Sequence, residues 1–355
     1  AGGDTASALA AGNPVVVRAH PAQPQTAALT AACVRAAITR AAAPAGAFAV
    51  LIGGGHDVSR ALVQHPAIRA VGFTGSLAGG RALLDAAARR PDPIPVHAEM
   101  ASTNPVIVLP GATLAADVLV ASITGSGGQL CTKPGLVIGH GNAFERVVEA
   151  LAAGMATAPA VAMLHDGIAA AYERATGALD DRPDVQVLAK GDRTGAEGVP
   201  TLVAVDAASV IDDATLAEEI FGPAAIAVRC ADEDELHAVA ASLSGHLTAT
   251  VWGSGDDLDA RPALLATLAA RAGRLVFNGV PTGVRVCAAM HHGGPWPATS
   301  DARHTSVGTA ALSRFARPIC WQDAPQAILP AALRDANELG IWRLVDGDFT
   351  REDIS

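Results

Sequence analysis

Short apolar strands that alternate with helices of about ten residues or more constrain the fold of this chain more than any other feature. In the first ninety residues three apolar segments are each followed by a loop and a helical pattern: 14–17 then 26–42, 48–52 then 57–64, and 70–73 then 77–89. Strands connected through helices are typical of a parallel sheet, because an antiparallel pair needs only a short turn. The sequence therefore predicts an α/β fold.

The same alternation returns after Glu99. Further apolar segments lie at 106–109, 136–138, 185–188, 224–228 and 248–252, and further helical patterns at 114–124, 144–156 and 233–243. Residues 290–307 are rich in Gly, Pro, Ser, Thr and His and predict an irregular loop, whereas 317–321 predicts a late strand. We expect three parts: residues 1–100, 101–287 and 288–355.

Composition excludes several classes of function. The 355 residues suggest about two domains. A net charge of −10 argues against a nucleic-acid partner, which needs clustered Lys and Arg. No apolar run approaches the ~20 residues of a membrane span. The five cysteines are scattered without CxxC spacing, so we expect reduced thiols, and the first residues carry no export signal. These features predict a cytoplasmic protein.

A cysteine follows a glycine-rich turn in the segment Gly127-Gly128-Gln129-Leu130-Cys131. A thiol in such a turn can meet a substrate and be activated by nearby backbone dipoles. Because a free thiol is mostly protonated at pH 7, it also needs a base or a positive field. On this pattern alone, Cys131 is either a nucleophile or a small buried residue.

Five segments, in the same order along the chain, resemble signature motifs of the aldehyde dehydrogenase superfamily. They are Gly12–Arg18, Gly72–Ser76, Glu99–Pro105, Gly128–Cys131 and Glu218–Pro223. Segments 278–284, 292–300, 305–309 and 317–321 are similar to the 2,5-dioxopentanoate (2-oxoglutarate semialdehyde) dehydrogenases, and related fatty aldehyde dehydrogenases share parts of them. The resemblance implies a cofactor domain with a parallel sheet, incomplete at its N-terminus, and an α/β catalytic domain.

The resemblance also implies a reaction. Cys131 would add to an aldehyde carbonyl to give a thiohemiacetal, hydride would pass to a nicotinamide, and Glu99 would activate water to hydrolyse the resulting thioester. A carboxylate with a raised pKa suits that last step. Without the motif, Glu99 would be taken for an exposed carboxylate at the end of a strand.

The expected cofactors are NADP and NAD. By resemblance, Arg18 ends a cofactor-holding strand, Ser76 faces the pyrophosphate, Glu219 holds the nicotinamide ribose and Phe221 lies near the nicotinamide. Arg18 stands where the family usually has Lys, and its planar guanidinium bonds with a different geometry. No acid follows it: Ala19-His20-Pro21 comes next, so we expect His20 at the same site and a 2′-phosphate to be tolerated.

Several departures from the family bear on activity. Full-length relatives carry a segment before the counterpart of Ala1, including an Asn that bonds the oxyanion, and Ala101-Ser102-Thr103 replaces the usual Gly-Gly-Lys. We therefore expect an N-terminally truncated chain. One hypothesis is an enzyme that forms a homodimer or homotetramer when full length and acts on a small aldehyde. The rival hypothesis is a non-catalytic remnant of the same fold.

Two further features have a plainer interpretation. The adjacent His291 and His292 have no partner at metal-ligand spacing, so we expect loop residues and no metal site. Cys287 lies near the substrate side by resemblance, and its expected role is packing.

Overall fold

The computed structural model describes residues 2–113, 116–191, 195 and 197–354. The chain divides into two compact units, Ala1–Phe315 and Ala316–Ser355. The larger unit contains a seven-stranded sheet in the order β13-β12-β5-β6-β11-β10-β8. Its strands are β5 (Val106–Val108), β6 (Leu136–Gly139), β8 (Gln186–Lys190), β10 (Thr201–Asp206), β11 (Ala224–Arg229), β12 (His246–Trp252) and β13 (Ala272–Phe277). Neighbouring strands are parallel except β8, which runs antiparallel to β10.

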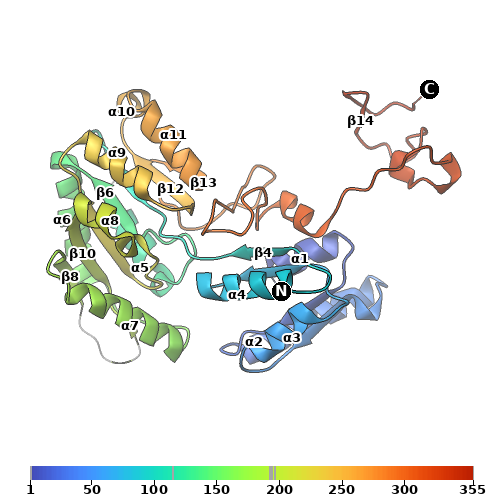
Figure 1. Ribbon diagram of the computed structural model, residues 1–355, viewed down its shortest axis with the longest axis horizontal. Coiled ribbons are helices and arrows are strands. Elements are labelled where there is room, and N and C mark those ends of the chain that lie inside the picture. Colours follow the sequence, from blue (N-terminus) through green and yellow to red (C-terminus); the bar gives the residue numbers. More distant parts are fainter. Residues whose placement is uncertain (1, 114–115, 192–194, 196, 355) are drawn as a thin grey trace. The chain divides into compact units, whose positions relative to one another are not determined.

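Helices cover both faces of this sheet. The helices are α5 (Ala116–Thr124), α6 (Gly141–Thr157), α7 (Asp166–Asp180), α8 (Ala207–Asp212), α9 (Glu233–Ser242), α10 (Gly255–Asp259) and α11 (Pro262–Arg271). On β6, Leu136 and Ile138 pack with α8, α9 and α11, while Val137 packs with α5 and α6 on the other face (Figure 1). Because both faces are buried, these strands are apolar throughout rather than alternating.

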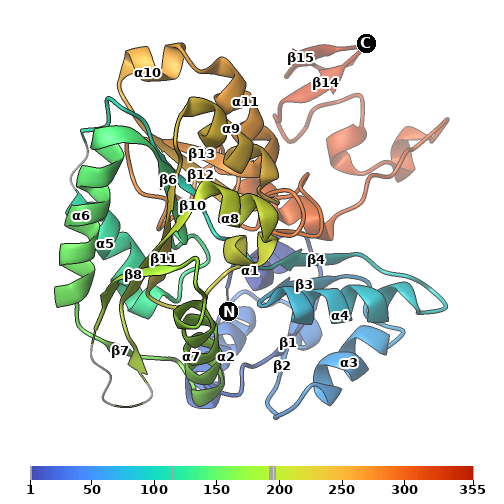
Figure 2. The ribbon, with the colours of Figure 1, turned by 60° about the vertical axis from the view of Figure 1, so that its left-hand side comes forward.

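The N-terminal part holds two small parallel pairs of strands. β1 (Val15–Arg18) pairs with β2 (Phe48–Leu51), and β3 (Val71–Thr74) pairs with β4 (Val96–Glu99). The helices there are α1 (Gly3–Ala10), α2 (Pro24–Arg40), α3 (Asp57–Gln64) and α4 (Leu77–Ala88), which Figure 2 shows around the strands. The predicted α/β class is thus confirmed, although the expected N-terminal sheet consists of two separate pairs among the described residues. The three-part division stays a prediction.

Short elements complete the larger unit. They are the 3-10 helices η1 (Ala45–Ala47), η2 (Gly125–Gly128), η3 (Ala214–Ala217) and η4 (Thr309–Phe315), and the antiparallel strands β7 (Val161–Ala162) and β9 (Glu197–Gly198). Residues 290–307 contain neither helix nor strand, which confirms the predicted irregular loop. The helix expected at 114–124 corresponds to α5, which is described from Ala116 to Thr124. Residues 114 and 115 lie outside the described part.

The smaller unit, residues 316–355, contains η5 (Gln326–Ile328), η6 (Ala331–Leu333) and an antiparallel hairpin of β14 (Arg343–Val345) and β15 (Asp348–Thr350). The predicted strand at 317–321 is wrong. These residues are assigned neither helix nor strand, and none of the described strands pairs with them. An apolar sequence can favour an extended backbone, but a strand needs a partner for its N–H and C=O groups.

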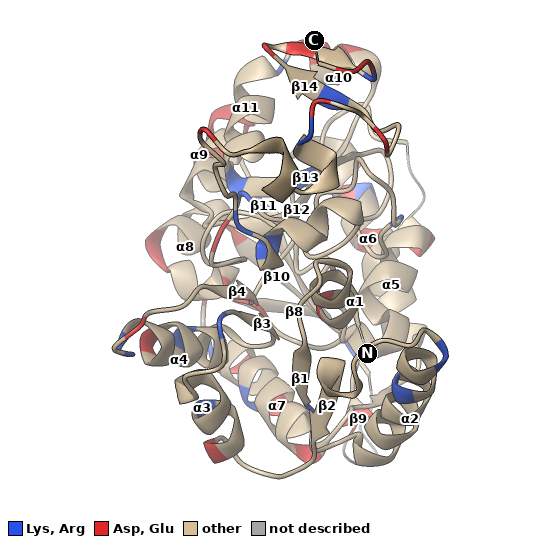
Figure 3. Cartoon of the chain, turned by 90° about the vertical axis from the view of Figure 1, so that its right-hand side faces the viewer, with Lys and Arg blue, Asp and Glu red and all other residues tan. Residues whose placement is uncertain are grey.

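Lys and Arg lie among Asp and Glu on the helices of the larger unit rather than along one element (Figure 3). Within the described residues, no helix is both long enough and apolar enough to cross a membrane.

Candidate active site

Glu99 is the last residue of β4, and a later segment of the chain holds it in place. Thr299 forms an antiparallel bridge with Glu99. Ser300 is bonded twice to the same strand: its hydroxyl accepts from Ala98 N at 2.9 Å and donates to Val96 O at 2.6 Å. The loop predicted as irregular therefore lies along β4, and Glu99 is only 6% exposed.

Cys131 follows the glycine-rich turn that begins at the end of α5. Ser126, Gly127 and Gly128 all have positive φ values, of 55°, 65° and 65°. A Cβ on Gly128 would lie 2.2 Å from the carbonyl carbon of Gly222, so no side chain fits there. This close approach holds the cysteine turn against the segment that contains Glu219.

Asn104 joins the cysteine turn to the segment after Glu99. It is fully buried, with φ of 51°, and its amide donates to Cys131 O at 2.9 Å and Lys133 O at 3.0 Å. Its carbonyl oxygen accepts from Ser102 at 2.8 Å and from Thr248 at 2.9 Å. Since both polar atoms of the Asn104 side chain are bonded, this buried amide fixes the backbone of the cysteine turn relative to Ser102 and Thr248.

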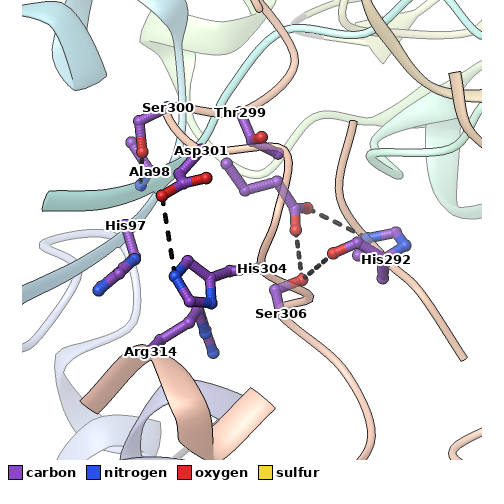
Figure 4. Close-up of a pocket in the computed structure, with 10 residues that line it drawn as sticks. His97, Ala98, His292, Thr299, Ser300, Asp301, His304, Ser306 and Arg314 are labelled. Atoms are coloured by element: carbon purple, nitrogen blue, oxygen red, sulfur yellow. Dashed lines mark hydrogen bonds and ion pairs between the residues drawn. The ribbon is translucent and has the colours of Figure 1, made fainter. Parts of the chain in front are cut away.

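His292 completes the site from the loop at 290–307. Its Nε2 lies 3.2 Å from Glu99 Oε1 and 3.5 Å from Cys131 Sγ. Ser306 Oγ donates to Glu99 Oε2 at 2.6 Å and also reaches His292 O at 3.1 Å. Figure 4 shows Ser306 and His292 together on one side of the pocket that these residues line, with Asp301 and His304 on the other. Both carboxylate oxygens of Glu99 are thus occupied.

The pKa values of Cys131 and Glu99 are shifted in opposite directions. Burial, followed by the nearby charge of Glu99, raises the pKa of the Cys131 thiol to about 12. Burial would also raise the pKa of Glu99, but hydrogen bonds from His292 and Ser306 outweigh it, so the net pKa of Glu99 is below its ordinary value. The resting arrangement is therefore a protonated thiol beside an ionised carboxylate. The raised pKa that the sequence led us to expect for Glu99 is wrong, because these hydrogen bonds favour its charged form.

Arg18 and His20, both expected at the cofactor, are neighbours at the end of β1. Arg18 donates to Gly55 O at 2.8 Å, while its buried Nε has no partner among the described residues. His20 packs against His165 with ring centroids 5.6 Å apart, and burial, then the charges of His165 and Arg18, lower the pKa of His20. An orphaned guanidinium N–H at the carboxyl end of a parallel strand suits an anionic group.

Ser76 and Glu219 are the expected cofactor residues that lie near Glu99 and Cys131. Ser76 is the N-cap of α4, where its Oγ accepts from Gly79 N at 3.2 Å. The preceding residue, Gly75, donates its N–H to Glu99 O at 3.0 Å. Glu219 is close enough to Cys131 for its charge to raise the thiol pKa. Ser76 is thus linked to Glu99 through its neighbour Gly75, and Glu219 lies near Cys131. Arg18 and His20 make their contacts with other residues, Gly55 and His165.

Lys133 is a buried cation that sequence reasoning did not single out. Its Nζ donates to Ala224 O at 2.8 Å, and only 2% of the residue is exposed. Burial lowers the pKa of Lys133 and raises that of Glu219, and each charge partly offsets the shift of the other. Phe221, two residues after Glu219, is half-buried. Lys133 and Glu219 are therefore near enough for the charge of each to shift the pKa of the other.

Arg274 on β13 is a second cation near the thiol. Its guanidinium donates to Pro281 O at 2.6 Å and to Gly283 O at 3.2 Å, and its buried Nε has no partner among the described residues. Burial lowers the pKa of Arg274, and Cys131 is near enough to act against that shift. A half-buried guanidinium with a free N–H near a nucleophile suits a substrate that carries a carboxylate.

Comparison with known proteins identifies relatives of the chain. The aldehyde dehydrogenase family matches residues 1–296. Alpha-ketoglutaric semialdehyde dehydrogenase 2 of Azospirillum brasilense is 47% identical over 355 residues, covering 98% of this chain and 68% of the relative. The alpha-ketoglutaric semialdehyde dehydrogenase of Acinetobacter baylyi is 44% identical over 360 residues, covering 99% and 68%. The chain thus spans about two thirds of the length of these relatives.

Solved structures resemble the fold. A glyceraldehyde-3-phosphate dehydrogenase of Methanocaldococcus jannaschii, complexed with NADP, superposes with a TM-score of 0.75 at 21% identity, over 88% of this chain and 67% of that one. A gamma-glutamyl-gamma-aminobutyraldehyde dehydrogenase of Burkholderia cenocepacia gives 0.73 at 26% identity, over 88% and 63%. These likenesses confirm the aldehyde dehydrogenase-like fold that the motifs predicted.

Asn104→Ala is expected to destabilise the protein by about 3 kcal/mol or more, because it leaves the buried carbonyls of Cys131 and Lys133 unpaired. Thr248→Val is the matched control: it removes one bond to the same amide and should cost about 1 kcal/mol. Urea unfolding, followed by tryptophan fluorescence, measures both. Equal losses for the two variants would contradict the role assigned to Asn104.

Proposed function

Because the chain belongs to the aldehyde dehydrogenase family, we propose that it oxidises 2-oxoglutarate semialdehyde (2,5-dioxopentanoate) to 2-oxoglutarate with a nicotinamide cofactor. The observation that carries the proposal is the cluster of Cys131, Glu99 and His292, in which a half-buried thiol lies beside an ionised carboxylate. The names of the two relatives support the choice of substrate.

The chemistry follows from the state of each group. Glu99 accepts the proton of the Cys131 thiol, and the sulfur attacks the aldehyde carbon to form a thiohemiacetal. His292 Nε2 lies 3.2 Å from the carboxylate and 3.5 Å from the sulfur, so in the tautomer that carries its proton on Nε2 it donates to whichever of them is charged. The bound nicotinamide supplies the hydride acceptor. Glu99 then releases this proton to solvent and takes one from the water that hydrolyses the thioester, and the Cys131 sulfur leaves as a thiolate that is protonated again.

The residues present fit a dinucleotide. Arg18 has an unpartnered buried N–H at the end of a parallel strand, and Ser76 opens the 12-residue helix α4, whose N-terminus favours a phosphate. Glu219 offers a carboxylate close to Cys131, where a ribose hydroxyl would donate to it. Phe221 and His20 complete the proposed set. We propose NADP as the preferred cofactor and NAD as the second.

The carboxylate of the substrate is proposed to lie on Arg274. Arg274→Met should raise KM for 2,5-dioxopentanoate about ten-fold or more, because one charge-assisted hydrogen bond contributes ~1.5–3 kcal/mol. KM for pentanal, which has the same chain length and no charge, should change little. Arg271→Met, at the C-terminal end of α11, where the guanidinium donates to Ala241 O at 2.9 Å, is the control. Steady-state kinetics with both aldehydes make the measurement.

An equal rise in KM for both aldehydes would refute the assignment of Arg274. If pentanal were oxidised as efficiently as the charged aldehyde by the wild type, a fatty aldehyde substrate would replace the one proposed.

Arg18→Ala is expected to weaken NADP binding more than NAD binding, by ~1–3 kcal/mol for one lost charge-assisted bond to the 2′-phosphate. The ribose of NAD is neutral at that position and gains less from the same cation. Titration of both cofactors at one fixed salt concentration, with Arg40→Ala as a control for surface charge, measures the difference. Equal losses would assign Arg18 to the shared adenosine ribose instead and remove the basis for an NADP preference.

A further inference from the structure

Three side chains of the types that bind zinc converge in the active site. One carboxylate oxygen of Glu99, Sγ of Cys131 and Nε2 of His292 all lie within 4.8 Å of one another. We propose that these three residues form a zinc site, and that a bound Zn²⁺ reversibly blocks the nucleophilic thiol. The proposal goes beyond the proposed function and does not depend on it, because it concerns metal binding by the protein without substrate.

The spacing of the ligand atoms fits tetrahedral zinc. Zn–S, Zn–N and Zn–O bonds of about 2.3, 2.05 and 2.0 Å, set at tetrahedral angles, put S and N about 3.6 Å apart and N and O about 3.3 Å apart. The corresponding distances are 3.5 Å between Cys131 Sγ and His292 Nε2, and 3.2 Å between His292 Nε2 and Glu99 Oε1. Two edges of the coordination polyhedron therefore exist before any metal binds.

The charges also fit a divalent ion. A Cys131 thiolate and a Glu99 carboxylate together carry two negative charges, and a neutral imidazole carries none, so the complex with Zn²⁺ is neutral. A neutral complex suits a buried position, where an unpaired charge is costly. Binding releases the thiol proton to solvent, because the sulfur coordinates as a thiolate.

Outer contacts already orient two of the three ligands. Ser306 Oγ holds the second oxygen of Glu99 at 2.6 Å, which leaves Oε1 facing His292. The backbone of His292 is fixed by Thr305, whose Oγ1 accepts from His292 N at 2.8 Å. A partner on the carboxylate is typical of metal sites, whereas His292 Nδ1 has no partner among the described residues. Cys131 is only half-buried, and the proposed fourth ligand of the ion is a water molecule.

Zinc bound in this way would stop the reaction directly. Coordination occupies the sulfur lone pair that attacks the aldehyde, and it also occupies the carboxylate that accepts protons. A chelator removes the ion and restores both groups. Like a catalytic zinc site, the proposed site has three protein ligands. Here, however, the bound zinc inhibits the enzyme.

Cobalt(II) provides a test that does not need turnover. Co²⁺ replaces Zn²⁺ at such sites, and a cobalt–thiolate bond gives an intense near-ultraviolet charge-transfer band. We expect the wild type to bind one equivalent with this band and Zn²⁺ to displace it. The band should vanish in Cys131→Ser, and in His292→Asn the affinity should fall by more than the ~10–100-fold typical of losing an outer partner. Ser306→Ala should lose about 10-fold.

Two matched variants serve as controls. His291→Asn changes the adjacent imidazole and Cys287→Ala changes another half-exposed thiol, and both should bind cobalt as the wild type does. Circular dichroism confirms that each variant is folded. Absence of the band in the wild type, or equal cobalt affinity in His292→Asn and His291→Asn, would overturn the proposal. If the wild type did not oxidise the aldehyde, the proposed function would be refuted, but the result of the cobalt-binding test would not change.

Discussion

The buried carboxylate of Glu99 is the group on which the site depends. A charge removed from water is stable only when it is paired and hydrogen-bonded. His292 and Ser306 provide those bonds, and both come from the loop at 290–307. The carboxylate therefore fixes that loop against β4, a strand almost 200 residues earlier in the chain. The same loop carries Thr299 and Ser300, whose contacts run along β4 and extend the attachment beyond the side chain.

Burial, together with the same charge, determines the state of the nucleophile. Cys131 is half-buried beside an anion, so its resting thiol stays protonated. The base that would remove the proton is the group that raises the thiol pKa. This arrangement protects a reactive sulfur at rest, because the thiolate is the form that oxidising agents attack. It also explains why a divalent cation would bind there: Zn²⁺ relieves the repulsion between a thiolate and a carboxylate.

Sequence patterns predicted those helices and strands whose signals lie within their own residues and the adjacent loops. The α3 helix, for example, was expected at 57–64 and is found there, because its amphipathic pattern and its flanking loops are local. The α7 helix and β13 were not singled out, since β13 follows the Ala-rich α11 without a turn residue between them. His292 could not be recognised as a site residue, because its contacts with Cys131 and Glu99 span 161 and 193 positions. Its only signal was the C-terminal resemblance.

The most direct test of this account is the rate at which iodoacetamide alkylates Cys131, measured against pH in the wild type and in Glu99→Gln. Alkylation without substrate follows the thiolate fraction. Removing the negative charge should lower the thiol pKa, so Glu99→Gln should react faster at every pH between about 7 and 10 while oxidising aldehyde more slowly. The wild-type rate should still be rising at the upper limit, because its thiol pKa is about 12. Slower alkylation in Glu99→Gln would contradict the account, since it would mean that Glu99 stabilises the thiolate.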